Sequence, residues 1–197
     1  MTTANKITIL RILLVPFFIS QVIYYAQTGN ELCRLLSIFS FAIASISDGI
    51  DGYIARKYHQ QSELGAILDP LADKLLLASG AVLVSIDNGP ILPRVPAWFV
   101  ITIMSRDVLL LIGTLVIHTI CGKVTVKPRF TGKLSTVLQM TTILWALFKW
   151  DQTILIRLAA GAAVLTTISG LLYVKDGMQQ LGASPASSAV NHKNHNS

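Results

Sequence analysis

The stretch SDGIDGYIAR at residues 47–56, followed by GAILDPLADK at residues 65–74, decides the fold of this 197-residue chain. Between long apolar runs it holds Asp48, Asp51, Asp69 and Asp73, four of the ten acidic residues. On a helix, a step of three or four residues places two carboxylates on one face. Two such helices facing each other would gather four carboxylates, which repel unless a cation neutralises them or protons stay bound. Oxygen ligands of this kind favour Mg²⁺ or Mn²⁺.

The composition indicates a membrane protein. Hydrophobic residues make up 52% of the chain and charged residues 13%, and the mean hydropathy is +0.60. We expect an all-α integral membrane bundle of six transmembrane helices, each near the length that crosses about 30 Å of hydrocarbon. The expected spans are 7–27, 32–50, 65–86, 95–118, 134–150 and 153–174. Residues 1–176 then form one membrane domain, and 177–197 form a disordered cytoplasmic tail.

The distribution of Lys and Arg predicts the orientation. On the expected topology, one face carries Lys6, Arg11, Arg56, Lys57, the basic loop around residues 123–133, and Lys175. The opposite face carries Arg34, Arg94, Lys149 and Arg157. The first face should therefore be cytoplasmic, with both termini and the four aspartates on that side. The net charge of +6 suits anionic lipid headgroups, and no pattern in the sequence indicates nucleic-acid binding.

The spacing Asp-x2-Asp-Gly-x2-Ala-Arg-x8-Gly-x3-Asp-x3-Asp resembles the signature of the CDP-alcohol phosphotransferases, membrane enzymes of phospholipid synthesis. Every fixed position is filled, whereas two ordinary Asp-rich helix ends would explain only one carboxylate pair. The resemblance implies a site for two Mg²⁺ or Mn²⁺ ions with Asp48, Asp51 and Asp69 as principal ligands. It implies that Asp73 is the general base for the acceptor hydroxyl and also touches the second ion. Family members often pair, so a homodimer is expected.

The same resemblance implies a binding site for CDP-diacylglycerol. Small residues on the motif helices would let the nucleotide approach the backbone, and an arginine would bind diphosphate oxygens in bidentate fashion. The predicted donor-lipid contacts are Asn5, Thr8, Gly52, Ala55, Arg56 and Gly65. The structural alternatives are helix packing for the glycines and alanine, and N-capping for Asn5.

Arg106 predicts where the acceptor binds. It falls with Asp107 near the middle of the fourth expected span, where an ionisable residue is costly enough to indicate function. The alternative is a structural pair between Arg106 and Asp107. Lys133, at the end of the basic loop, adds a cation that could converge with Arg106 on a phosphate of the acceptor. An acceptor that carries phosphate is therefore expected.

Residues near Arg106 and the stretch GKLSTVLQM at 132–140 resemble the branch of the family that transfers a phosphatidyl group to glycerol 3-phosphate and releases CMP. This branch commonly has Arg-Glu where the chain has Arg106-Asp107. Arg-Asp-Val resembles the cardiolipin synthases of the family, whose acceptor is phosphatidylglycerol, so that alternative stays open. A small cation transporter is a third hypothesis, disfavoured because the aspartates lie at helix ends. The resemblance implies a multi-pass protein of the bacterial inner membrane.

Overall fold

The computed structural model describes the backbone of residues 3–58, 63–86, 91–121 and 130–182. It describes side chains for residues 9–47, 72–86, 91–117, 119 and 130–179. The regular structure in this part of the chain consists of α-helices. The helices are α1 (Thr3–Thr28), α2 (Glu31–Tyr58), α3 (Glu63–Ser85), α4 (Ala97–Cys121), α5 (Phe130–Leu147) and α6 (Gln152–Gly182). Each of the six expected helices is present, so the all-helical fold is confirmed for the described residues.

Local signals set the turns at one end of the molecule. Gly29 ends α1 with a φ of 67°, and its N–H donates to the Tyr25 carbonyl at 2.8 Å. The Asn30 side chain then caps α2 by accepting from the Leu32 N–H at 3.0 Å. Asp151 caps α6 in the same way, accepting from the Ile154 N–H at 2.9 Å.

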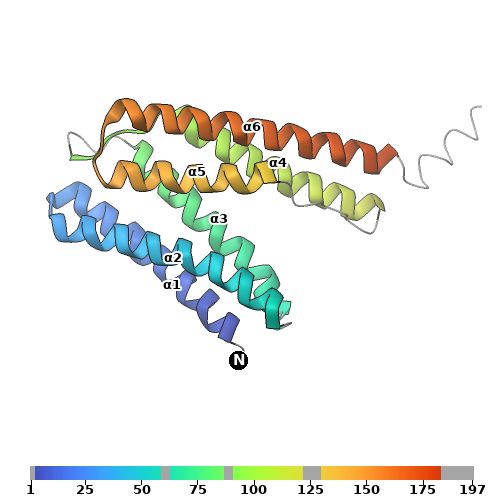
Figure 1. Cartoon of the computed structure of the whole chain (residues 1–197), viewed down its shortest axis with the longest axis horizontal. Coiled ribbons are helices and arrows are strands. Elements are labelled where there is room, and N and C mark those ends of the chain that lie inside the picture. Colours follow the sequence, from blue (N-terminus) through green and yellow to red (C-terminus); the bar gives the residue numbers. More distant parts are fainter. Residues whose placement is uncertain (1–2, 59–62, 87–90, 122–129, 183–197) are drawn as a thin grey trace, which may run out of the picture.

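The helices form two groups (Figure 1). Helices α1, α2 and α3 run as one group, and α4, α5 and α6 run as the other. The groups meet at the end that holds the α1–α2 and α5–α6 turns, and their axes diverge toward the end that holds the N-terminus. A continuous apolar core joins the groups where they meet. Within the first group, the ring centroids of Phe18 on α1 and Phe41 on α2 lie 5.3 Å apart. The core also contains Leu76, Phe99, Ile143 and Leu155.

The pattern of burial is that of a chain surrounded by lipid. Large apolar side chains lie on the outside, such as Leu111 at 70% exposure and Phe39 at 63%. Polar side chains lie inside, where the buried Gln139 donates to Thr166 at 2.8 Å between α5 and α6. Interhelical hydrogen bonds of this kind satisfy polar groups away from water. Three helical segments are long and apolar enough to cross a membrane: Ile9–Thr28, Ala97–Ile117 and Gln152–Gln179. Spans for α2, α3 and α5 stay a prediction.

Two helices extend furthest beyond the boundaries expected from hydropathy. Helix α2 continues past residue 50 to Tyr58, and α6 continues past Asp176 to Gly182. Hydropathy locates the segment that fits in hydrocarbon, whereas a helix ends where its backbone hydrogen bonds end, so polar turns are missed. Residues 177–182 are therefore helical and not part of a disordered tail. The rest of the predicted tail lies outside the described residues.

Candidate active site

The signature residues share one face on each of two helices. On α2, residues 48, 51, 52, 55 and 56 follow the spacing i, i+3, i+4, i+7, i+8 of a single helical stripe. On α3, residues 65, 69 and 73 are spaced four apart and also share a face. The two helices are in contact. The side chains of Asp48, Asp51 and Asp69 lie outside the described part, so the metal site stays a prediction.

Asp73 is the one signature carboxylate whose side chain is described. It is half-buried, and its Oδ1 atom is shielded from solvent. A partly shielded carboxylate suits the predicted role of a general base, provided that the acceptor hydroxyl comes within hydrogen-bond reach. The donor-lipid contacts predicted on α1, Asn5 and Thr8, lie outside the described side chains. Arg11, one turn further along α1, is buried at 1% exposure.

Three charged side chains meet between α3 and α4, and one of them, Lys74, follows Asp73 in the sequence. Lys74 on α3 donates from Nζ to Oδ1 of Asp107 on α4 at 2.7 Å. Arg106 donates from Nη1 to the same oxygen at 2.8 Å. We call Lys74, Arg106 and Asp107 the Asp107 cluster. Two cations on one carboxylate leave one excess positive charge, which favours an anionic ligand.

The Arg106 side chain occupies a slot between α5 and α6. A Cβ atom added to Gly132 would lie 3.4 Å from Arg106 Nη2, and one added to Gly170 would lie 3.4 Å from Arg106 Cγ. Ser169 accepts from Nη2 at 3.4 Å. The side chain is 13% exposed, so most of it is removed from solvent. Small residues on two neighbouring helices thus make room for one large cation.

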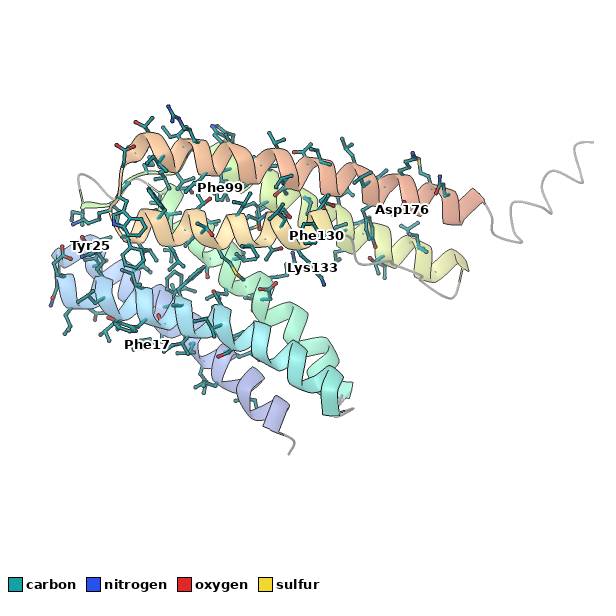
Figure 2. The ribbon with its side chains drawn as sticks, viewed as in Figure 1. Phe17, Tyr25, Phe99, Phe130, Lys133 and Asp176 are labelled. Carbon is teal, nitrogen blue, oxygen red and sulfur yellow. The ribbon has the colours of Figure 1, made fainter. Side chains whose placement is uncertain are left out.

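The pair between Arg106 and Asp107, which the sequence left as an alternative, is therefore present. It does not exclude a phosphate, because a guanidinium has five N–H donors. Among the described residues Arg106 uses Nη1 and Nη2 in one hydrogen bond each, and its buried Nε has no partner there. Lys133 follows Gly132 directly and is exposed (Figure 2), at the N-terminal end of α5. The structure thus brings Gly132, at the start of α5, against Arg106, and the acceptor site stays a prediction.

Lys74 is the member of this site that the sequence analysis missed. Its position immediately after Asp73 was the available signal, since a lysine in an apolar helix needs a counter-ion. The counter-ion lies 33 residues away on another helix, and no local pattern names it.

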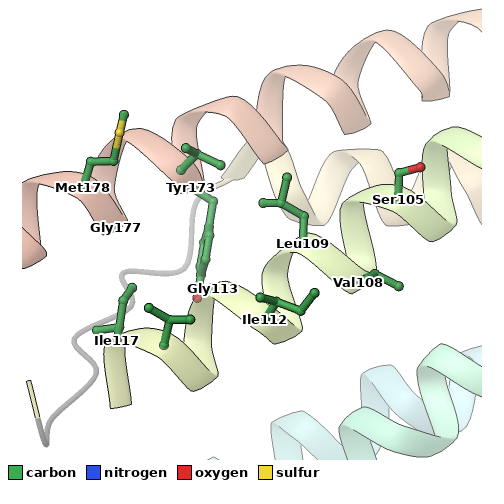
Figure 3. A pocket seen from close by; sticks show the side chains of 11 residues that line it. Ser105, Val108, Leu109, Ile112, Gly113, Ile117, Tyr173, Gly177 and Met178 are labelled. Atoms are coloured by element: carbon green, nitrogen blue, oxygen red, sulfur yellow. The ribbon is translucent and has the colours of Figure 1, made fainter. Parts of the chain in front are cut away.

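A cavity of about 600 Å³ lies between α4 and α6, further along both helices from Arg106 (Figure 3). It is lined by Val108, Leu109, Ile112, Ile117, Tyr173 and Met178, among others. None of the lining residues is charged, and none is a predicted site residue. Tyr173 and Thr114 share a hydrogen bond of 2.6 Å at this part of the interface. The cavity suits hydrocarbon and not a diphosphate.

Comparison with known proteins identifies similar chains. Residues 1–170 match the family described as CDP-alcohol phosphatidyltransferase. The chain is 32% identical over 175 residues to a protein of Shigella flexneri serotype 5b named CDP-diacylglycerol–glycerol-3-phosphate 3-phosphatidyltransferase, covering 85% of this chain and 90% of the relative. A Salmonella typhimurium protein with the same name shows the same values. A Mycobacterium tuberculosis protein named "Probable phosphatidylglycerophosphate synthase" is 30% identical over 185 residues, covering 91% of this chain and 83% of the relative.

Proposed function

Because this chain belongs to the CDP-alcohol phosphatidyltransferase family, we propose that it transfers a phosphatidyl group from CDP-diacylglycerol to glycerol 3-phosphate. The products are phosphatidylglycerophosphate and CMP. The names of the relatives favour this acceptor. The observation that carries the proposal is the cationic Arg106, which packs against Gly132 and is linked through Asp107 to Lys74, the residue after Asp73 on α3. An acceptor with one phosphate and one reactive hydroxyl fits a cation next to a base.

The chemistry is a displacement at phosphorus. The acceptor hydroxyl oxygen forms a bond to the phosphorus of the phosphatidyl group, and the bond from that phosphorus to the bridging oxygen breaks. CMP leaves with the electron pair, and the Asp73 carboxylate takes the proton of the hydroxyl. Arg106 and Lys133 bind the acceptor phosphate, and Arg106 has the firmer placement because its slot restricts the guanidinium.

The proposed metal site consists of Asp48, Asp51, Asp69 and Asp73. Carboxylate oxygens are the hard ligands that two Mg²⁺ or Mn²⁺ ions require, so the chemistry of this residue set fits the ions. Bound metal would neutralise charge on the diphosphate of the donor. Gly52, Ala55 and Gly65 on the same stripes provide close approach to the backbone for the nucleotide, and Arg56 adds a guanidinium for phosphate oxygens.

The proposed setting is the bacterial inner membrane, with the active site and both termini at the cytoplasmic face. Apolar helices that expose Leu111 and Phe39 support a lipid environment, and the excess of Lys and Arg on one face supports the orientation. A homodimer is proposed by resemblance to the family alone.

The test is an assay of CMP release by the purified full chain in detergent micelles that contain CDP-diacylglycerol. We expect release with glycerol 3-phosphate and Mg²⁺ or Mn²⁺, and none after chelation of the metal. Phosphatidylglycerol is tested in parallel as the sole acceptor. Efficient release with phosphatidylglycerol alone would instead assign cardiolipin synthase activity, and no release with either acceptor would contradict a transferase.

A further inference from the structure

Asp107 has an unusual position for a carboxylate in an anion-binding site. A negative charge next to the acceptor phosphate should weaken its binding through repulsion. Asp107 nevertheless lies in contact with Arg106, the cation proposed to hold that phosphate, and it is only 21% exposed. Asp107 should therefore favour acceptor binding in some other way that outweighs its repulsion of the phosphate.

The contacts of Asp107 indicate what that contribution is. Its Oδ1 atom accepts from Lys74 at 2.7 Å and from Arg106 at 2.8 Å, so a single atom fixes two cations that would otherwise repel each other. Lys74 belongs to α3 and Arg106 to α4. The carboxylate thereby links the helix that carries Asp73 to the helix that carries the acceptor cation.

The other contacts of Arg106 are weaker than its ion pair with Asp107. The Nη2 atom of Arg106 lies near Gly132 and Ser169, whereas Nη1 contacts Asp107. The contact to Ser169 is long at 3.4 Å and involves a neutral hydroxyl, so it is weaker than the ion pair. Without Asp107, Lys74 would repel Arg106, and Ser169 alone would orient the guanidinium.

We propose that Asp107 is a positioning residue for the acceptor: by holding Lys74 and Arg106 on one oxygen, it sets the distance between the acceptor phosphate and the base Asp73. This inference rests on the proposed function. An acceptor bound at one end by Arg106 brings its hydroxyl to Asp73 only when α3 and α4 keep a fixed relation. Asp107 acts through Arg106 and does not touch the substrate.

The sign of the effect of Asp107→Asn distinguishes positioning from simple electrostatics. If Asp107 only contributed charge, its neutralisation would lower the KM for glycerol 3-phosphate, because the site would become more positive. If Asp107 positions Arg106, the same variant should raise that KM about tenfold or more, since a charge-assisted contact is lost from the productive geometry. The KM for CDP-diacylglycerol should change by less than about twofold, because the donor does not use Arg106.

Two further variants and one matched control complete the experiment. Asp107→Glu restores the carboxylate with one more methylene and should recover part of the lost affinity for glycerol 3-phosphate. Lys74→Gln removes the α3 half of the link and should raise the same KM less than Asp107→Asn does, and the double variant should be less than additive. Glu31→Gln is the control, because Glu31 also pairs with one arginine and one lysine, far from the site. Its acceptor KM should match that of the wild type.

The outcomes distinguish failure of the positioning role of Asp107 from failure of the proposed function. Suppose that the wild type releases CMP with glycerol 3-phosphate. An unchanged or lowered KM for glycerol 3-phosphate in the folded Asp107→Asn variant then overturns the positioning role but not the proposed function. If Asp107→Asn does not fold, an unchanged KM in both Asp107→Glu and Lys74→Gln overturns it. A wild-type protein that releases no CMP with glycerol 3-phosphate overturns the proposed function, and this inference with it.

Discussion

Two carboxylates in this chain each bind one arginine and one lysine: Glu31 at the end that holds the α1–α2 turn, and Asp107 further along the molecule, on α4. Asp107 holds Arg106 and Lys74 on a single oxygen and is 21% exposed. Glu31 holds Arg34 with Oε2 and Lys149 with Oε1, and is 55% exposed. The cations of the two clusters are similarly exposed, so the difference lies in the carboxylate, which is shielded in the Asp107 cluster and open to solvent at the α1–α2 turn. The two clusters have the same charges, so the exposure of the carboxylate and its position in the fold are what distinguish the Asp107 cluster from the Glu31 cluster.

The cations of Glu31 have other partners that hold them in place. Arg34 also donates to the Leu147 carbonyl at 3.1 Å, and Lys149 lies 5.3 Å from the centre of the Tyr25 ring. These contacts join the α1–α2 turn to the α5–α6 turn, where Trp145 and Trp150 also meet at 4.5 Å. Glu31 is thus one of several residues that connect the two turns, and we call Glu31, Arg34, Lys149 and Tyr25 the Glu31 joint. Asp107 is the principal partner of its two cations among the described residues.

The largest effects should come from the predicted metal ligands. Asp48→Asn, Asp51→Asn and Asp69→Asn should each reduce CMP release below detection, because an amide removes ligand charge at nearly unchanged volume. Glu31→Gln, the same kind of change at the α1–α2 turn, should keep wild-type turnover. The measurement is CMP release at saturating substrates and metal, with elution from size exclusion to verify folding. Wild-type turnover in any aspartate variant would remove that residue from the site.

Asp73→Asn should act mainly on the chemical step. Loss of a general base costs about 10²- to 10⁴-fold in rate, since the amide cannot take the proton of the acceptor hydroxyl. Binding of CDP-diacylglycerol should weaken much less. Turnover and donor affinity are measured on the same preparation. An equal loss in both would make Asp73 chiefly a metal ligand.

Arg106→Ala should produce a selective loss of acceptor affinity. We expect the KM for glycerol 3-phosphate to rise about tenfold to a hundredfold, which corresponds to about 1.5 to 3 kcal/mol for a charge-assisted contact. Lys133→Ala should act in the same direction but more weakly, because Lys133 is exposed and mobile side chains bind less firmly. Acceptor titration at saturating donor measures both. An unchanged KM in folded Arg106→Ala would exclude the proposed phosphate contact.

Gly132→Ala should have a smaller effect of the same kind. The new methyl group would lie 3.3 Å from Ser169 Oγ, which must shift by a few tenths of an ångström, and 3.4 Å from Arg106 Nη2, so the guanidinium would be displaced through its hydrogen bond to Ser169. We expect the acceptor KM to rise by a few fold, as a small misplacement of a binding group does. Gly161→Ala is the matched control, because no atom lies within 4 Å of its added Cβ. Equal kinetics for the two variants would show that the slot tolerates the methyl group.

The sequence predicted much of this arrangement, for physical reasons that differ between its parts. Long apolar runs and the stripe from Asp48 to Arg56 predicted the helices and their shared faces, because helical periodicity is local. The signature predicted which carboxylates belong together, although the side chains that would test it lie outside the described part. Helix ends beyond hydrocarbon, at Tyr58 and Gly182, were missed because hydropathy carries no signal for them.

Contacts between distant helices were the least predictable. The sequence placed Arg106 beside Asp107 as neighbours, yet it could not show that Lys74 reaches the same oxygen or that Gly132 and Gly170 make the slot. Such contacts depend on how α3, α4, α5 and α6 approach one another. That approach is decided by packing over whole helices, and not by the identity of any single residue.

The smallest effect should be the pH dependence of the Glu31 joint. Hydrogen bonds from Arg34, and then from Lys149, lower the pKa of Glu31. A carboxyl whose pKa is lower in the folded state stabilises the fold above its unfolded value of about 4.3, and this contribution is lost as the pH falls through the folded pKa. Tyr25, and then Glu31, raise the pKa of Lys149. That contribution is present below its unfolded value of about 10.4 and is lost as the pH rises through the folded pKa.

The joint should therefore be complete between about pH 5 and pH 10, bounded by these two unfolded values. Within this window, Glu31→Gln should lower the thermal unfolding midpoint slightly, because exposed ion pairs are screened by water and salt. Below the folded pKa of Glu31 the wild type and the variant should converge, since the wild-type carboxyl is then neutral as well. Thermal unfolding of both proteins in the same detergent, from pH 3 to pH 8, measures this. A difference that persists at the lowest pH would mean that Glu31 acts through packing and not through its charge.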